Sequence, residues 1–269
     1  MSVTVKKVAL NGFSMEYITF GSGKTPLVII PGLSVQSVMP AAEAVAAEYA
    51  CMASDFTVYL FDRRAEIPEK YPVADMSRDT FAAIDALGIG DFCLFGASQG
   101  GMISMRMALD HPGRVLKLAL ASTSARVEET EIVRGWINFA KKKDAGGLYL
   151  DFGKKVYPPK VFESLRGALV SAAETVTERE LERFCVLAEA VCGFDVLDEL
   201  PSLACPVLLT WSDDDAVLGA GSASAIAGKL WANPGFETFE YRGYGHAVYD
   251  TAPDHRERLR DFFLKEAKK

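Results

Sequence analysis

Apolar residues in the first half of the chain follow two alternating patterns. Short runs rich in β-branched and aromatic residues predict strands at 3–8, 13–20, 27–30, 57–61, 92–95 and 115–121. Between them, apolar residues at helical spacing predict helices at 40–49, 77–87 and 99–110. This alternation indicates an α/β fold with a mostly parallel sheet flanked by helices. The first two strands should be antiparallel, because Asn11-Gly12 is a hairpin turn pair.

The pattern changes between residues 125 and 195, where strand-like runs are absent and helices are predicted at 131–143, 160–174 and 177–191. Thr177 and Glu180 have the spacing of a capping box at the start of the last helix. Strand patterns return at 206–211 and 236–241, and an amphipathic helix is expected from Asp254 onward. We therefore predict one core domain, residues 1–124 and 196–269, interrupted by a helical lid of residues 125–195.

Composition narrows the possible partners without naming a substrate. The chain has 269 residues, of which 49% are hydrophobic and 24% charged, as in ordinary globular proteins. A net charge of -7 argues against binding to nucleic acid or to anionic membranes. No apolar run approaches the length of a membrane span, and the first residues lack a signal-peptide pattern. The five cysteines include no Cys-x-x-Cys pair, as expected of reduced thiols, so a cytoplasmic location is predicted.

A candidate nucleophile lies in Gly96-Ala97-Ser98-Gln99-Gly100, the one Gly-x-Ser-x-Gly in the chain. It follows a predicted strand directly and precedes a predicted helix, which is the context this motif requires. A sharp turn there would strain the backbone at Ser98 and expose its hydroxyl above the sheet. The alternative is a glycine-rich helix start with Ser98 as its N-cap.

A serine hydroxyl needs a neighbouring base, usually a histidine held by a carboxylate. Of the three histidines, His246 is the candidate, because it lies on a glycine-rich loop between the last predicted strand and the last helix. A purely structural role in that loop is the alternative. His111 is expected to interact with the carbonyls at a helix end, and His255 to be solvated on a charged helix face.

The carboxylate candidates are Asp213, Asp214 and Asp215, which directly follow the predicted strand 206–211. Some of them are expected only to form the turn. An oxyanion also needs backbone donors, for which we expect the amides of Gln99 and Leu33. Leu33 follows Pro31-Gly32, which could also be an ordinary turn.

Together these residues resemble the α/β-hydrolase family, in particular its small lid-bearing esterases, lactonases, haloperoxidase-like enzymes and carbon–carbon-bond hydrolases. The resemblance extends over nearly the whole chain outside the lid and includes Phe20-Gly21-Ser22-Gly23, Phe61-Asp62-Arg63-Arg64, Asp85-Ala86-Leu87-Gly88, His111-Pro112-Gly113 and Cys205-Pro206-Val207-Leu208. It implies an eight-stranded α/β-hydrolase fold with a helical lid. It also selects Asp215 as the acid, since the family places it fourth in a Gly-x-x-Asp stretch.

Two loops depart from the family pattern. Relatives commonly have His-Gly where this chain has Pro31-Gly32, and a glycine-rich turn where it has Ala65-Glu66-Ile67-Pro68. Both loops are expected near the mouth of the active site.

The resulting hypothesis is a serine hydrolase that cleaves a small, largely apolar carboxylic ester through an acyl-enzyme, with no cofactor and no metal. Four lid aromatics suggest an apolar pocket, although they could equally form the lid core: Trp136, Phe139, Phe162 and Phe184. The alternatives are a carbon–carbon-bond hydrolase, an acyltransferase, or a non-catalytic ligand-binding protein on the same fold. The sequence leaves the substrate and the oligomeric state open.

Overall fold

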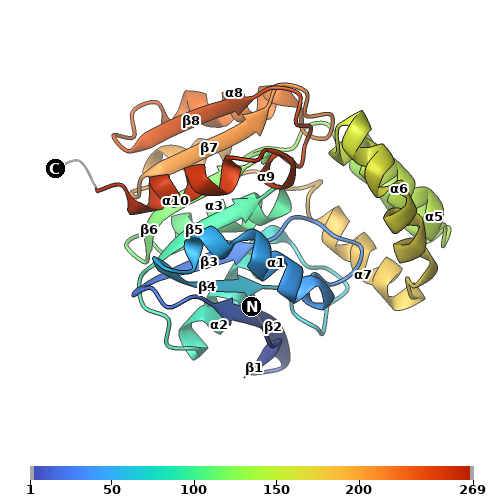
Figure 1. Cartoon of the computed structure of the whole chain (residues 1–269), viewed down its shortest axis with the longest axis horizontal. Helices are drawn as coiled ribbons and strands as arrows, with labels where there is room; N and C mark the ends of the chain where they lie inside the picture. Colours follow the sequence, from blue (N-terminus) through green and yellow to red (C-terminus); the bar gives the residue numbers. More distant parts are fainter. Residues whose placement is uncertain (1–2, 267–269) are drawn as a thin grey trace.

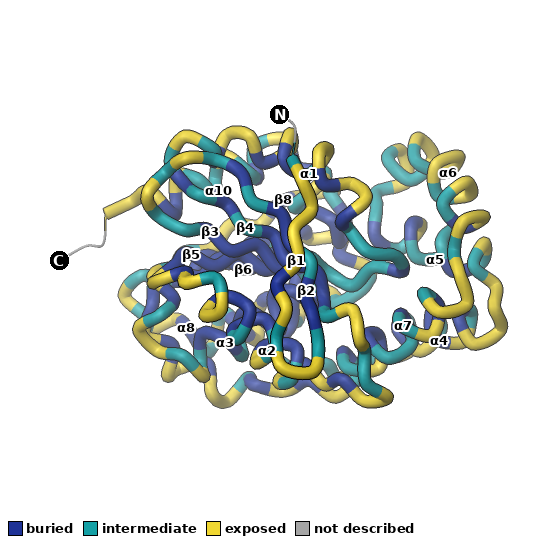
Figure 2. Tube along the Cα trace, turned by 90° about the horizontal axis from the view of Figure 1, so that it is seen from below, coloured by how far each residue is buried: buried dark blue, intermediate teal, exposed yellow. Residues whose placement is uncertain are grey.

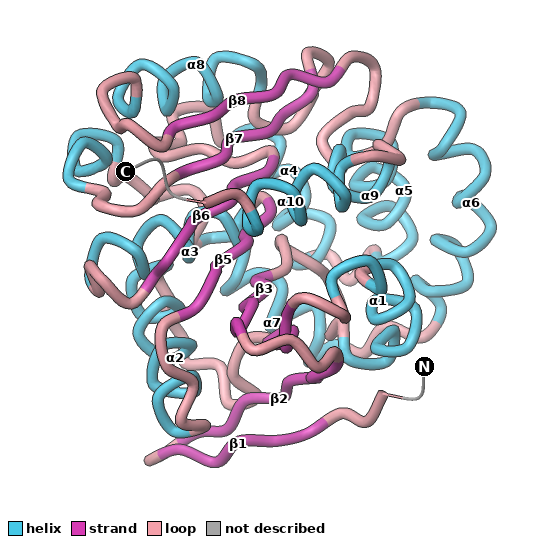
Figure 3. The backbone as a smooth tube through the Cα atoms, turned by 60° about the vertical axis from the view of Figure 1, so that its left-hand side comes forward, coloured by secondary structure: helices cyan, strands magenta, loops and turns pink. Residues whose placement is uncertain are grey.

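The computed structural model describes residues 3–266, which form a sheet with strand order β1-β2-β4-β3-β5-β6-β7-β8. Its strands are β1 (Lys6–Leu10), β2 (Phe13–Phe20), β3 (Thr25–Ile30), β4 (Phe56–Phe61), β5 (Phe92–Ala97), β6 (Val115–Ala121), β7 (Val207–Ser212) and β8 (Phe236–Tyr241). Strands β1 and β2 pair antiparallel at one edge, β2 pairs antiparallel with β4, and the remaining pairs are parallel (Figure 3). The mostly parallel eight-stranded sheet predicted from the sequence is confirmed.

Helices cover both faces of this sheet, which is buried between them (Figure 2). One face packs against α2 (Val73–Ala86), α3 (Gln99–Asp110) and α8 (Gly219–Leu230), and the other against α1 (Ala42–Glu48), α9 (Val248–Thr251) and α10 (His255–Leu264). Short 3-10 turns lie at Met39–Ala41, Ala50–Met52 and Leu197–Ser202. Within the described residues, no helix is long and apolar enough to span a membrane.

Several boundaries differ from the prediction. Strand β1 lies at Lys6–Leu10 rather than at 3–8, because the two-residue turn pairs Leu10 with Phe13 and so sets the register. Helix α2 starts at Val73, directly after Pro72. Helix α8 was not predicted, since its sequence GAGSASAIAGKL consists mostly of small residues with little apolar periodicity.

Between β6 and β7 the chain forms four helices that lie beside the sheet (Figure 1). They are α4 (Glu131–Lys141), α5 (Ala145–Val156), α6 (Pro159–Glu174) and α7 (Glu178–Glu189). The glycine-rich α5 was not predicted. Asp144 caps it by accepting a hydrogen bond from the Gly147 amide at 2.7 Å. Gly153 permits the close approach of α6, because a Cβ there would lie 2.5 Å from Leu169 Cδ1.

The two ends of this helical segment are joined to each other. The Val127 amide donates to the Phe194 carbonyl at 3.1 Å, and the Val196 amide donates to the Ala125 carbonyl at 2.8 Å. The Arg126 guanidinium also forms an ion pair with Asp195 at 2.8 Å. The chain therefore leaves the sheet and returns to it at one place, with residues 125–127 beside 194–196.

Candidate active site

Ser98 occupies a strained turn between β5 and α3. Its φ of 52° and ψ of -122° lie in a backbone region that residues other than glycine rarely adopt. The flanking glycines are required by space, since a Cβ on Gly96 would lie 2.3 Å from the Gly100 carbonyl oxygen, and one on Gly100 would lie 2.0 Å from the Ile30 carbonyl oxygen. Ser98 makes no side-chain hydrogen bond to the helix that it precedes. Its hydroxyl is therefore available for another partner.

That partner is His246, which follows β8 and contacts both Ser98 and Asp215. Ser98 Oγ donates to His246 Nε2 at 2.9 Å, and His246 Nδ1 donates to Asp215 Oδ2 at 2.8 Å. These donor and acceptor roles follow from Asp215, because a carboxylate only accepts hydrogen bonds. The imidazole proton is therefore assigned to Nδ1, and Nε2 accepts from Ser98. The His246 and Asp215 side chains are both buried.

Asp215 remains ionised despite its burial. Burial alone would raise its pKa, but the charge and hydrogen bond of His246 and the amides of Leu218 and Val217 outweigh it, so the pKa lies below its usual value. Those amides donate to Oδ1 at 3.1 Å and 2.8 Å, which leaves Oδ2 facing His246.

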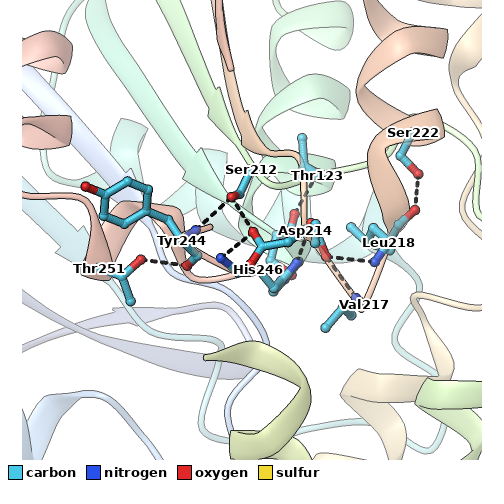
Figure 4. A network of polar contacts seen from close by, with 12 residues as sticks. Thr123, Ser212, Asp214, Val217, Leu218, Ser222, Tyr244, His246 and Thr251 are labelled. Carbon is cyan, nitrogen blue, oxygen red and sulfur yellow. Dashed lines mark hydrogen bonds and ion pairs between the residues drawn. The ribbon is translucent and has the colours of Figure 1, made fainter. Parts of the chain in front are cut away.

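The two neighbouring aspartates accept hydrogen bonds from the backbone of the loop that carries His246, and not from the His246 side chain; Figure 4 shows Asp214 among these contacts. Asp214 Oδ1 accepts from the Gly245 amide at 2.8 Å, and Asp213 Oδ1 accepts from the Gly243 amide at 3.0 Å. Of the three candidate carboxylates, the structure brings only Asp215 into contact with His246.

Two backbone amides are free beside Ser98. Gln99 is the first residue of α3, where helix geometry leaves the N–H without an intrahelical acceptor. Leu33 follows β3 and lines the same cavity as Ser98. Within residues 3–266, neither the Gln99 nor the Leu33 amide has a hydrogen-bond partner. Both amides are therefore available to donate to another acceptor.

A cavity of about 20 Å³ lies above Ser98 and His246, which is room for little more than one water molecule. Its other lining residues are apolar or aromatic: Leu33, Met102, Val133, Trp136, Phe152, Val156, Val191, Val217, Leu218 and Tyr249. Of the four aromatic residues between 125 and 195 that the sequence suggested for the pocket, only Trp136 is among them. Phe152 was missed because its helix was not predicted. A larger groove of about 620 Å³ lies between β8 and α10 and contains none of the candidate site residues.

The other two histidines lie outside this site. The prediction that His255 is solvated is wrong: the residue is 0% exposed, and its Nε2 lies 3.0 Å from Thr210 Oγ1. The charged residues around it obscured the fact that it faces the sheet. His111 ends α3 as expected, but its ring stacks on Phe81 at a centroid distance of 3.4 Å.

Comparison with known proteins gives the family. The model of the alpha/beta hydrolase fold family matches residues 25–161, just over half of the chain. The chain belongs to the α/β-hydrolase family. This α/β-hydrolase is 26% identical over 190 residues to the "Putative carbamate hydrolase RutD" of Caulobacter vibrioides, covering 69% of this chain and 70% of that protein. It is 21% identical over 221 residues to "3-oxoadipate enol-lactonase 2" of Acinetobacter baylyi, covering 80% and 79%.

Solved structures show the same fold. The enzyme MGS-M2 from a deep-sea metagenome library superimposes with a TM-score of 0.87 at 19% identity, covering 98% of this chain and 99% of that one. The enol-lactonase from Burkholderia xenovorans LB400 superimposes with a TM-score of 0.83 at 19% identity, covering 97% and 100%. The chain is therefore an α/β-hydrolase whose sequence relatives include proteins named as a putative carbamate hydrolase and an enol-lactonase.

Proposed function

We propose that this α/β-hydrolase is a serine hydrolase that cleaves small, neutral, apolar carboxylic esters. The observation that supports this most strongly is the continuous pair of hydrogen bonds from Ser98 through His246 to Asp215, at 2.9 Å and 2.8 Å. A nucleophile, a base and a carboxylate that orients the base are the three parts that acyl transfer requires.

In the first half of the proposed reaction, Ser98 Oγ attacks the ester carbonyl carbon while its proton passes to His246 Nε2. The ionised Asp215 stabilises the imidazolium that forms. The carbonyl oxygen, now an anion, accepts hydrogen bonds from the free amides of Leu33 and Gln99. Collapse of this intermediate breaks the bond to the alcohol oxygen, which takes the proton from His246 and leaves an acyl-enzyme.

In the second half, water replaces the alcohol. His246 removes a proton from the water as its oxygen attacks the acyl carbon, and the same two amides again hold the oxyanion. The bond to Ser98 Oγ then breaks, the proton returns to the serine, and the carboxylic acid is released. The cycle needs no cofactor.

The cavity lining supports an uncharged substrate. None of its lining residues carries a charge apart from what His246 acquires during catalysis. Burying an anion against these apolar side chains would be unfavourable, because nothing there replaces its hydration. We therefore expect esters with neutral, apolar acyl groups to be preferred over acyl groups that bear a carboxylate.

The size of the cavity supports a lid. An ester does not fit into about 20 Å³, and Val133, Trp136, Phe152, Val156 and Val191 from residues 125–195 form one wall of that space. We propose that this segment is a lid that moves away to admit substrate and closes to exclude water. The paired residues at its two ends would serve as its hinge.

Turnover of short p-nitrophenyl esters by the unmodified enzyme and by Ser98→Ala tests the proposal. We expect hydrolysis of the butyrate ester, and a loss of at least about 10³-fold in Ser98→Ala. Equal rates for the two proteins would refute a serine mechanism. An acyltransferase or a carbon–carbon-bond hydrolase would instead show Ser98-dependent activity mainly with an added acceptor alcohol or with a diketone.

A further inference from the structure

The free amides of Leu33 and Gln99 belong to two separate segments, and one buried side chain connects them. Arg63 follows β4, at the end of the sheet where the parallel neighbours β3 and β5 also end, and it is only 5% exposed. Its Nη2 donates to the Pro31 carbonyl at 2.7 Å and to Gln99 Oε1 at 3.2 Å. A single guanidinium nitrogen therefore bridges the loop after β3, where relatives commonly have a histidine, and the residue that follows the nucleophile.

The same connection continues into the lid helix α7. Gln99 Nε2 donates to the Leu187 carbonyl at 2.5 Å. Leu187 lies in the last turn of α7, where carbonyls lack intrahelical partners. Beside it, Asp62 accepts a hydrogen bond from Arg183 of α7 at 3.0 Å. Docking of α7 against the core thus involves the two residues Asp62 and Arg63 in succession.

The charge of Arg63 is costly for stability and is not offset by an ion pair. Burial lowers its pKa to about 10, against the opposing influence of Asp62, so the guanidinium remains protonated near neutral pH. Within the described part of the chain no carboxylate forms an ion pair with it, and its buried Nε has no partner. Burying an apolar residue of similar volume would destabilise the folded state less. A methionine at this position would lose the two hydrogen bonds that Nη2 of Arg63 donates.

We propose that Arg63 is a positioning residue for the oxyanion site: it fixes the loop of Leu33 relative to Gln99 when α7 is docked. This inference rests on the proposed serine mechanism. A planar guanidinium donates along two fixed directions, which an ammonium group does not reproduce. Misplacing an oxyanion donor should slow the steps that generate the oxyanion and leave ground-state binding in the apolar cavity nearly unchanged.

The test compares Arg63→Met with Arg64→Met in the full-length enzyme, using p-nitrophenyl butyrate. Arg64 is a matched control, because it contacts Asp79 and the Glu66 carbonyl instead of the site. We expect kcat to fall about 10- to 100-fold in Arg63→Met with KM changed less than about threefold, and Arg64→Met to resemble the unmodified enzyme. Added guanidinium should restore part of the activity of Arg63→Ala. An unchanged kcat in Arg63→Met, or equal losses in both methionine variants, would overturn the role.

A second variant covers the case in which Arg63→Met does not fold. Gln99→Met keeps the backbone amide but removes the side-chain link to Arg63 and Leu187, and it should also lower kcat more than it raises KM. Where both variants fold, their effects should be non-additive, since they interrupt one connection; additive effects would count against it. The Ser98→Ala variant distinguishes failure of the two proposals. If the unmodified enzyme is no more active than Ser98→Ala, the serine mechanism is refuted. If activity depends on Ser98 but Gln99→Met has the same kcat as the unmodified enzyme, only the positioning role is refuted.

Discussion

Replacing Asp215 by asparagine should move the imidazole proton of His246 from Nδ1 to Nε2 while preserving the turn. Oδ1 of Asp215 accepts from the Val217 and Leu218 amides at 2.8 Å and 3.1 Å. The asparagine oxygen can accept the same two bonds, which directs its NH₂ group toward His246 Nδ1. An NH₂ group donates, so Nδ1 must accept and the proton moves to Nε2. In that tautomer Nε2 no longer accepts the proton of Ser98.

The size of the effect follows from the loss of both functions of the carboxylate. The imidazolium loses its buried counter-charge at 2.8 Å, and the base is held in the wrong tautomer. The same substitution in a serine protease triad lowers kcat about 10⁴-fold, and we expect a similar loss here. That factor corresponds to about 5 kcal/mol of transition-state stabilisation.

The assay is kcat for p-nitrophenyl butyrate, with Asp213→Asn as the matched control. Asp213 accepts from the Gly243 amide, which an asparagine oxygen can also do, and it does not contact His246. We expect the control to stay within about threefold of the unmodified enzyme. A loss of less than tenfold in Asp215→Asn, or an equal loss in Asp213→Asn, would refute the assignment of the acid.

Two further predictions concern the buried histidine and the cavity. Burial, followed by the charge of Arg256, lowers the pKa of His255 to about 3, so between about pH 6.5 and 3 the unfolded chain binds a proton that the folded chain does not. The free energy of unfolding should therefore fall with decreasing pH by up to about 1.4 kcal/mol per pH unit. Urea unfolding at pH 7, 6 and 5 should show that this free energy depends less steeply on pH in His255→Gln than in the unmodified enzyme. An equal dependence in the two proteins would contradict this prediction. Phe152→Ala should enlarge the cavity and raise kcat/KM for the hexanoate relative to the acetate ester at least about tenfold, while Phe139→Ala, outside the cavity, leaves the ratio unchanged.

Those parts of the fold that depend on local pattern could be predicted from the sequence. Apolar β-branched runs mark the central strands, and the Asn11-Gly12 turn marks the antiparallel opening pair. Helices α5 and α8 escaped prediction because glycine and small side chains provide little apolar periodicity. Their stability comes from tertiary contacts, such as the space that Gly153 leaves for Leu169, and such contacts have no local signature.

The candidate site could be predicted in part. Ser98 and His246 stand out because strand–turn–helix and glycine-rich loop contexts are visible locally, and the structure places their side chains in contact. Choosing Asp215 among three adjacent aspartates required the family pattern, since only the fold decides which carboxylate faces His246. The role of Arg63 has no local signature in the sequence, because its partners Pro31 and Gln99 lie 32 and 36 residues away.

A Ser98 that His246 activates as a nucleophile should react covalently with a fluorophosphonate. The unmodified enzyme and Ser98→Ala should be incubated with a fluorophosphonate and analysed by intact mass and peptide mapping. We predict stoichiometric modification on Ser98, strongly slowed labelling in His246→Ala, and none in Ser98→Ala. An unlabelled enzyme that remains folded, or a label on a residue other than Ser98, would show that Ser98 is not the nucleophile.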